Sequence, residues 1–438
     1  MQKADLIIQN GLIVTVNDQM EIIENGAIAI AGNKIAAIDS TENILKTFET
    51  EKMIDATSKI VIPGLINAHS HLPMTYFRGL ADDLPLMKWL QEYIWPAEAR
   101  FLNPEFVYHA ALHGAAEMIK GGTTCFNDMY FFSYNIAEAA AEAGLRGIVG
   151  EVVMNALPGN KQKENEIFDY VSTSRKSFKR NDLIDFTIAP HAIYTCDKEI
   201  LLKSLEFARE NDMLLHIHVA ETEQEVIDSL RNFGKRPVEY LKEIGFLEHK
   251  TIFAHGIWIN DAELAIIKNK NVSIVVCTES HMKLASGFAP MKQYFENEIT
   301  VCLGTDGVSS NNNLDMFSEM DFTAKLHKAY NNDPTLLPAE KVLKMATINA
   351  ARALGKEDQI GSLEAGKLAD IITIKTAELA NLPMYNVYSH LVYTINSNSV
   401  NDVIINGEVV MQSRELVNLN EAELQERARK YAAKIRAK

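Results

Sequence analysis

Histidine residues stand at the ends of short apolar runs along this chain of 438 residues. His69 and His71 follow the run IVIPGLINA. Alternate residues of a strand face the same side and lie about 6.6 Å apart. Two imidazoles so placed can reach one ion, since zinc–nitrogen bonds are about 2.0–2.1 Å long. A lone His-x-His pair also arises by chance, so this pair needs support from elsewhere in the chain.

The same arrangement recurs at three more places. His216 and His218 end the run LLHIHV, His255 ends TIFAH, and Asp306 follows VCLGT. His216 and His218 share one face of a strand, and we favour His218 as the ligand. Neutral imidazoles with one carboxylate suit Zn²⁺, with Fe²⁺ and Mn²⁺ as competitors. We therefore expect one divalent ion, whose candidate ligands are His69, His71, His218, His255 and Asp306.

Glu221 lies three residues after His218, in the loop that follows the predicted strand. A carboxyl group beside a ligand can transfer protons to and from a substrate. The simpler alternative for Glu221 is a solvated loop carboxylate. For any one of the histidines, the simpler alternative is a buried residue of the core. The recurrence of the pattern favours a shared site over both.

Strand-like runs alternate with helical segments from residue 57 to residue 359. Eight such runs predict an α/β fold, a (β/α)₈ TIM-type barrel that carries its functional groups at the carboxyl ends of the strands. The candidate ligands stand at such ends.

Segments 1–56 and 360–412 are rich in β-branched residues, and each is too short to close a core alone. We expect them to form one small β-sandwich domain, with turns at Asn10-Gly11 and Gly32-Asn33. Residues 413–438 form a charged amphipathic C-terminal helix, on the surface or at a subunit contact.

The composition narrows the classes of partner. A net charge of −15 disfavours nucleic acid and anionic membranes. No apolar run approaches the roughly 18–20 residues of a membrane helix, and the N-terminal segment lacks the layout of a signal peptide. Four well-separated cysteines without a Cys-x-x-Cys pair indicate a reducing compartment. We expect a cytoplasmic protein.

Four motifs resemble the amidohydrolase superfamily, in its cytosine-deaminase and chlorohydrolase branch. They are PGLINAHSH at 63–71, HVAET at 218–222, AHG at 254–256 and GTDG at 304–307. Segment 78–99 is similar to the corresponding part of 5-methylthioadenosine/S-adenosylhomocysteine deaminases. The resemblance extends over essentially the whole chain.

The resemblance implies a role for each matching position. His69, His71 and His218 would bind the metal together with Asp306, and His255 would be either a further ligand or a base beside the metal and its water. Glu98 would hydrogen-bond the ribose hydroxyls, and His191 would line the pocket. Binuclear relatives carry a lysine on the fourth strand, which here reads DFTIAPHAIY, so the resemblance implies one zinc per subunit.

The implied reaction is hydrolytic deamination of 5-methylthioadenosine, S-adenosylhomocysteine or adenosine to the inosine analogue and ammonia. Metal-bound hydroxide would attack C6 of the purine, because a metal lowers the pKa of water to about 7. Asp306 would take the proton of the water, Glu221 would bind the substrate and protonate its ring, and His255 would stabilise the hydroxide. The family also often forms homo-oligomers.

Two positions depart from the family's pattern. Glu151 stands where relatives that accept the homocysteine tail carry arginine, and His281 stands where asparagine is usual. The alternatives are a guanine-deaminase-like or triazine chlorohydrolase-like enzyme, and a non-catalytic scaffold. A ribose-binding carboxylate at Glu98 would have no hydroxyls to bind in a free base or a triazine. The intact set of metal ligands argues against a non-catalytic scaffold.

Overall fold

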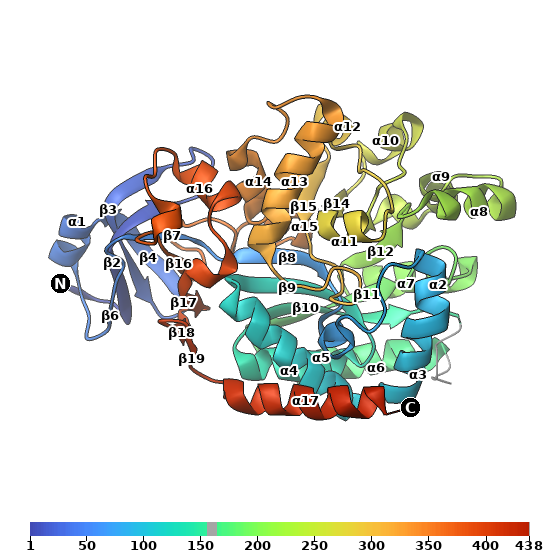
Figure 1. Cartoon of the computed structure of the whole chain (residues 1–438), viewed down its shortest axis with the longest axis horizontal. Coiled ribbons are helices and arrows are strands. Elements are labelled where there is room, and N and C mark those ends of the chain that lie inside the picture. The colour runs from blue at the N-terminus through green and yellow to red at the C-terminus, as the bar shows by residue number, and fades with distance from the viewer. Residues whose placement is uncertain (156–163, 438) are drawn as a thin grey trace.

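The computed structural model describes residues 1–155 and 164–437, and its centre is a barrel of parallel strands (Figure 1). Eight strands pair in chain order, and the last returns to the first through a parallel bridge between Ser70 and Asp306. The (β/α)₈ prediction is confirmed. The strands are β8 (Leu65–Ser70), β9 (Thr123–Tyr130), β10 (Arg146–Val153), β11 (Ile184–Pro190), β12 (Leu215–Val219), β13 (Thr251–His255), β14 (Val272–Val276) and β15 (Thr300–Leu303).

Helices surround the barrel, and several begin at a side chain that caps free backbone N–H groups. Asn103, Asp197 and Thr222 cap α4, α7 and α8 in this way. The helices that follow the strands are α4 (Pro104–Lys120), α5 (Ser133–Ala143), α6 (Glu164–Ser177), α7 (Lys198–Glu210), α8 (Glu223–Phe233), α9 (Pro237–Glu243), α10 (Asp261–Ile267), α11 (Thr278–Lys283), α12 (Met291–Glu296), α13 (Met316–Asn331), α14 (Ala339–Met345) and α15 (Ile348–Leu354).

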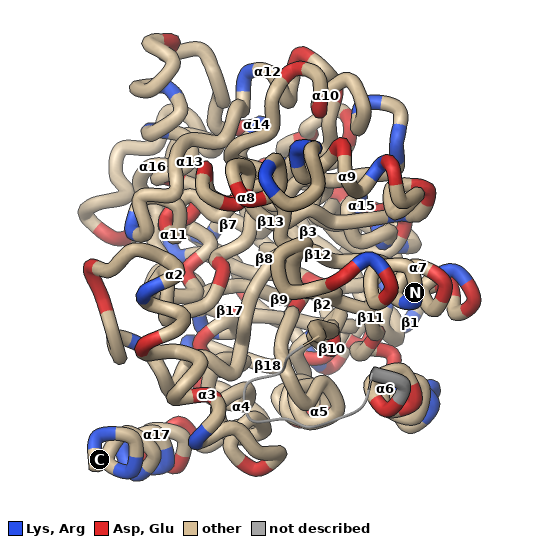
Figure 2. The backbone as a smooth tube through the Cα atoms, turned by 90° about the vertical axis from the view of Figure 1, so that its right-hand side faces the viewer, with Lys and Arg blue, Asp and Glu red and all other residues tan. Residues whose placement is uncertain are grey.

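The loop after β8 holds further helical turns beside the carboxyl ends of the strands. They are η1 (Leu72–Phe77), α2 (Leu86–Trp89), the π-helical turn η2 (Leu90–Ile94) and α3 (Trp95–Phe101). Figure 2 shows charged residues mainly along outer helices such as α7 and α17, whereas the barrel strands are largely uncharged.

Segments from both ends of the chain form one nine-stranded sheet beside the barrel (Figure 1). They join where β7 pairs antiparallel with β16, so strand pairing extends the N-terminal part of this sheet to Pro63. The strands are β2 (Leu6–Val14), β3 (Ile22–Ala31), β4 (Lys34–Ser40), β6 (Met53–Asp55), β7 (Lys59–Pro63), β16 (Ile371–Lys375), β17 (Val400–Ile405), β18 (Glu408–Gln412) and β19 (Glu415–Leu416).

The predicted turn at Asn10-Gly11 is wrong, because β2 runs straight through it. Asn10 adopts a φ of 63° and the pairing with β3 shifts register there, so the pair forms a bulge and not a hairpin. Gly11 is required by close packing, since a Cβ would lie 2.6 Å from Cγ2 of Val61. The turn at Gly32-Asn33 is confirmed between β3 and β4.

Helix α17 (Glu421–Arg436) follows the sheet and lies along α4. The ring of Tyr431 stacks on that of Tyr76 at a centroid distance of 5.1 Å. Lys438, the last residue of the expected C-terminal segment, lies outside the described residues. Among the described helices, none is both long and apolar enough to cross a membrane.

A buried ion pair ties the barrel to the nine-stranded sheet. Arg146, at the start of β10, donates from Nε and Nη2 to the carboxylate of Asp370, over 2.7 and 3.0 Å. The backbone N–H of Asn406 donates to the same carboxylate. Arg146 and Asp370 are only 3% and 4% exposed, so neither charge can be solvated if its partner is lost.

We predict that Arg146→Met lowers the free energy of unfolding by about 3–5 kcal/mol, because Asp370 would stay buried without its cation. Urea denaturation followed by circular dichroism measures this. The control is Lys46→Met, which removes the exposed Lys46–Glu42 pair and should cost less than about 1 kcal/mol. Equal losses in the two variants would contradict this role of Arg146.

Candidate active site

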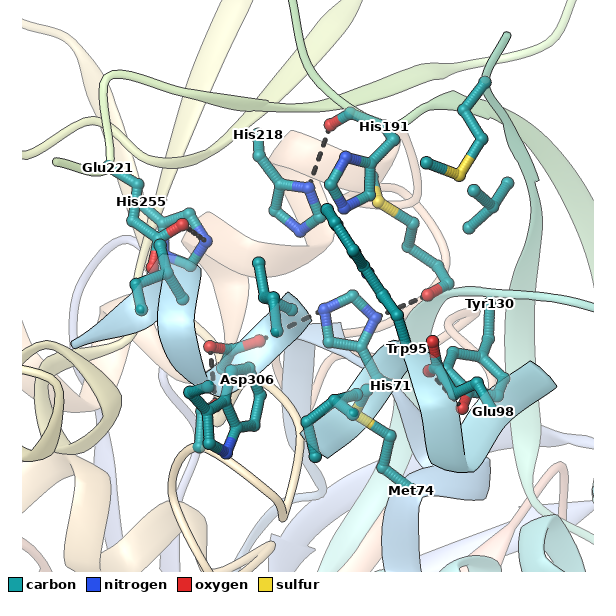
Figure 3. Close-up of a pocket in the computed structure, with 18 of the residues that line it drawn as sticks. His71, Met74, Trp95, Glu98, Tyr130, His191, His218, Glu221, His255 and Asp306 are labelled. Atoms are coloured by element: carbon teal, nitrogen blue, oxygen red, sulfur yellow. Dashed lines mark hydrogen bonds and ion pairs between the residues drawn. The ribbon is translucent and has the colours of Figure 1, made fainter. Parts of the chain in front are cut away.

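The candidate ligands meet at the carboxyl ends of the barrel strands (Figure 3). His69 lies near the end of β8 and His71 directly after it, while His218 and His255 lie near the ends of β12 and β13. Asp306 follows β15. Potential ligand atoms of His69, His218 and His255 lie within 4.8 Å of one another, and so do those of His69, His71 and Asp306.

At the mouth of the barrel, the backbone that follows β15 lies close to the backbone of β8. Gly304 packs against the backbone of β8, where a Cβ would lie 2.6 Å from the nitrogen of His69. The N–H of Asp306 donates to the carbonyl of His69 over 3.0 Å. His255 and Asp306 adopt φ values of 74° and 60°, which non-glycine residues rarely do. Backbone strain of this kind gathers at functional sites.

Hydrogen bonds on the outer side fix the direction of the imidazole rings. Nδ1 of His71 donates to the carbonyl of Met129, and Nδ1 of His218 donates to that of His191 over 2.9 Å. A neutral imidazole that donates from Nδ1 keeps a lone pair on Nε2. His71 and His218 therefore turn a free electron pair toward the centre of the site.

The other two imidazoles also have their outer nitrogen engaged. Nδ1 of His69 lies 2.9 Å from Nε2 of His216, and Nδ1 of His255 lies 3.1 Å from Nε2 of His281. Nε2 of His69 is buried and has no hydrogen-bond partner. This orphaned nitrogen, with the lone pairs of its neighbours, fits a bound cation.

Asp306 supplies the negative charge of the cluster. Its Oδ1 lies 3.4 Å from Nε2 of His69 and 3.2 Å from Nε2 of His71. Its Oδ2 accepts hydrogen bonds from the hydroxyls of Ser280 and Ser310, over 2.7 and 2.9 Å. Burial raises the pKa of this carboxyl, but the two histidines outweigh burial and hold the pKa well below its ordinary value.

Burial lowers the pKa of His71, but the neighbouring Asp306 outweighs burial and raises that pKa; at the other candidate histidine ligands burial prevails. Burial is the largest effect on the pKa values of His218 and His255, which lie well below the ordinary value for histidine. Both rings are therefore neutral near pH 7, the form in which imidazole binds metals. The donor set of neutral imidazoles and one carboxylate fits a divalent transition metal.

Glu221 faces the same centre from the loop after β12. Its Oε2 lies 3.7 Å from Nε2 of His255, and its backbone N–H donates to the carboxylate of Glu225. Burial, followed by the charges of Asp306 and Glu225, raises the pKa of Glu221 well above its ordinary value. This shift favours the protonated carboxyl group, which is the form that can donate a proton.

A second group of potential ligands lies directly behind the first. His255, Cys277 and His281 offer atoms within 4.8 Å of one another. The contact between Nδ1 of His255 and Nε2 of His281 occupies two of these atoms with a hydrogen bond. Burial is the largest effect on the Cys277 thiol and raises its pKa well above the ordinary value, which opposes the thiolate that metals prefer. This group therefore serves to orient His255.

The central pocket contains about 690 Å³ of empty space, part of it open to solvent. Glu98 and His191 both line it, as do Met74, Trp89 and Trp95. Glu98 is 3% exposed and accepts a hydrogen bond of 2.6 Å from the hydroxyl of Tyr130. Burial raises the pKa of Glu98 to about 7. Figure 3 shows Glu98 and Tyr130 across the pocket from Glu221 and His255.

Glu151 does not line this pocket, although its position was expected to bear on the tail of the substrate. Its carboxylate accepts hydrogen bonds from the backbone N–H groups of Phe132 and Ser133, at the start of α5. The neighbouring pocket wall is made by Val152 and Met154. Within residues 1–155 and 164–437, no lysine or arginine lines the central pocket.

Sequence reasoning missed several residues that contact the site. Ser280 and Ser310 bind Asp306, and Tyr130 binds Glu98. A signal for Tyr130 was present, because it ends the strand β9, where barrel enzymes place functional groups. Ser280 lies in the short helix α11 and Ser310 in a turn after β15, and no spacing rule marks either serine.

The comparisons agree with this architecture. A sequence profile of the Amidohydrolase family matches residues 60–410. The chain is 40% identical to a 5-methylthioadenosine/S-adenosylhomocysteine deaminase of Thermodesulfovibrio yellowstonii, over 98% of each chain. It is 42% identical to a 5'-deoxyadenosine deaminase of Methanothermobacter thermautotrophicus, over 94% of this chain and 95% of the relative.

A solved structure is also similar over its full length. It is a crystal structure of an adenosine deaminase from Xanthomonas campestris with bound zinc, which superposes with a TM-score of 0.97. The two chains are 38% identical, and each is covered completely. The profile match and the near-complete coverage at 40% identity or more show that this chain belongs to the amidohydrolase family.

Proposed function

We propose that the protein is a zinc-dependent hydrolytic deaminase that converts adenosine analogues to inosine analogues and ammonia. The observation that carries the proposal is the position of two buried carboxyl groups on one cluster of imidazoles, with Asp306 against His69 and His71 and Glu221 against His255. Two carboxyl groups with opposed pKa shifts provide a base and an acid at the same pH. The names of the relatives support the same reaction class.

The proposed ligands are His69, His71, His218 and Asp306, with His255 facing the same point. When bound, a divalent ion would supply a water acidic enough to lose a proton near pH 7. The zinc bound in the Xanthomonas relative supports zinc, and one compact donor cluster supports one ion per chain.

Asp306 is the proposed base that accepts the proton of the attacking water. The hydroxyls of Ser280 and Ser310 hold its Oδ2, so Oδ1 keeps its place toward the histidines. Nε2 of His255 lies beside Glu221 and can stabilise the oxygen that attacks C6. His281 positions the His255 ring from behind.

Glu221 is the proposed acid. Protonation of the ring nitrogen beside C6 makes that carbon electrophilic, and NH₃ leaves only after the exocyclic nitrogen gains a proton. Glu221 can supply the first proton from its own carboxyl group. The resulting carboxylate can then take the proton of the hydroxyl group added at C6 and pass it to the amine, which leaves as NH₃. Proton transfer of this kind accelerates a reaction by about 10²–10⁴-fold.

Glu98 is the proposed partner of the ribose hydroxyls. Tyr130 engages Oε1 of Glu98, which leaves Oε2 as an acceptor inside the pocket. A guanine or triazine substrate has no ribose hydroxyls for this buried carboxyl to bind, which favours a nucleoside substrate. His191 lines the same pocket and is a proposed contact of the substrate.

The pocket supports a substrate with an uncharged group at the 5' carbon. S-adenosylhomocysteine carries an ammonium and a carboxylate on its tail, and the described lining offers no cation to the carboxylate. The four cysteines are free and buried, which supports a reducing cytoplasm. An assembly of several copies stays an expectation.

We predict that Glu221→Gln lowers kcat for deamination by about 10²–10⁴-fold, because the amide cannot supply the proton. Metal content should remain near one ion per chain, since Glu221 is not among the proposed ligands. The matched control is Glu223→Gln, an exposed carboxylate in the first turn of α8. A Glu221→Gln enzyme with the kcat of the unaltered protein would refute the assigned role.

We also predict that the zinc-loaded protein deaminates 5'-deoxyadenosine and 5-methylthioadenosine with a kcat/KM at least about tenfold above that for S-adenosylhomocysteine, because a charged group would lose water without gaining a partner. The fall in adenine absorbance and the release of ammonia measure the rates. Ammonia from guanine, with no adenosine analogue consumed, would refute the proposed function.

A further inference from the structure

A second cavity opens directly beside the central pocket. It contains about 1140 Å³ of empty space, part of it open to solvent. Trp95, Met154 and Tyr194 line both cavities, so these three side chains form a shared wall. The remaining lining residues are Asn155, Ile193, Thr195, Cys196, Asp197, Lys198, Phe233 and Tyr240.

The shared wall stands at the ribose end of the proposed substrate. Trp95 begins α3, and Glu98 follows it by about one turn of the same helix. In a nucleoside bound with C6 near His255 and Glu221 and with its ribose hydroxyls on Glu98, the 5' carbon would lie near Trp95. Figure 3 shows Trp95 between the histidines and Glu98. A group attached to the 5' carbon therefore leads toward the second cavity.

The lining of the second cavity is mainly aromatic and aliphatic. Phe233, at the end of α8, stacks on Tyr240 of α9 with ring centroids 4.1 Å apart. Ile193 and Met154 are buried beneath, and Phe233 is 37% exposed. Such an exposed aromatic surface gains free energy when an apolar group covers it.

The charged residues of this cavity do not make a site for an amino-acid tail. The carboxylate of Asp197 caps α7 through the N–H of Ile200 and accepts a second hydrogen bond from Asn155. Lys198 is the one cation that lines the cavity within the described residues, and it lies exposed at the start of α7. A solvated lysine offers little to a tail carboxylate.

The geometry points to a subsite for apolar 5' substituents, made of the wall Trp95, Met154 and Tyr194 and the aromatic pair Phe233 and Tyr240. The ligand class is a 5'-alkylthio or 5'-arylthio adenosine whose tail is longer than a methyl group. This inference rests on the proposed function, because it places the adenine and the ribose as that function does.

The first test uses the unaltered, zinc-loaded protein and a series of 5'-alkylthio-5'-deoxyadenosines from methyl to butyl. We expect kcat/KM to rise by about three- to fourfold for each buried methylene, mainly through a lower KM. A kcat/KM that falls steadily as the chain lengthens would overturn the subsite. S-adenosylhomocysteine as a better substrate than the butylthio compound would also overturn it.

The second test compares two apolar residues of α8. Phe233→Ala should lower the ratio of kcat/KM for the butylthio compound to that for 5'-deoxyadenosine by about fivefold, since the aromatic surface is lost. Leu230→Ala is the matched control, because Leu230 is 46% exposed on the same helix and does not line either cavity. Its ratio should not change.

The outcomes separate the two proposals. If no adenosine analogue is deaminated, the proposed function fails. If 5'-deoxyadenosine is deaminated but the ratio is the same in Phe233→Ala and in the unaltered protein, the subsite alone is wrong. A smaller ratio in Phe233→Ala, with an unchanged ratio in Leu230→Ala, supports it.

Discussion

The hydrogen bonds that hold the imidazoles from behind are the constraint on which the site depends. Carbonyl groups of Met129 and His191 accept the Nδ1 protons of His71 and His218, so both rings present a lone pair inward. If either carbonyl moved, its histidine could rotate and turn an N–H toward the centre. Met129 lies in strand β9, and His191 directly follows strand β11. The barrel therefore sets the orientation of the rings as well as their position.

Closure of the barrel adds the acidic part of the site. β15 returns to β8 through the close approach of Gly304 to His69, and Asp306 then lies against His69 and His71. The nine-stranded sheet lies outside this arrangement but is tied to it through Arg146 and Asp370. Residues more than 200 positions apart in the chain thus meet because the first and last strands are neighbours.

Much of this site was predictable because strand periodicity is local. The spacing of His69 and His71, and the runs that end in His218 and His255, place each side chain at a strand end. Asn10-Gly11 misled the prediction, because the same residue pair favours a turn and a bulge, and only pairing with β3 and β7 decides between them. The cap that Glu151 provides for α5 and the cavity beyond Trp95 depend on packing between distant segments, which spacing does not encode.

The central claim is that inward-facing imidazoles and Asp306 hold one divalent ion. Anomalous diffraction from crystals of the zinc-loaded protein, measured on both sides of the zinc absorption edge, tests it most directly. The account predicts a single peak per chain, within bonding distance of Nε2 of His69, His71 and His218 and of the Asp306 carboxylate. A peak between His255, Cys277 and His281, or none at the barrel mouth, would contradict it.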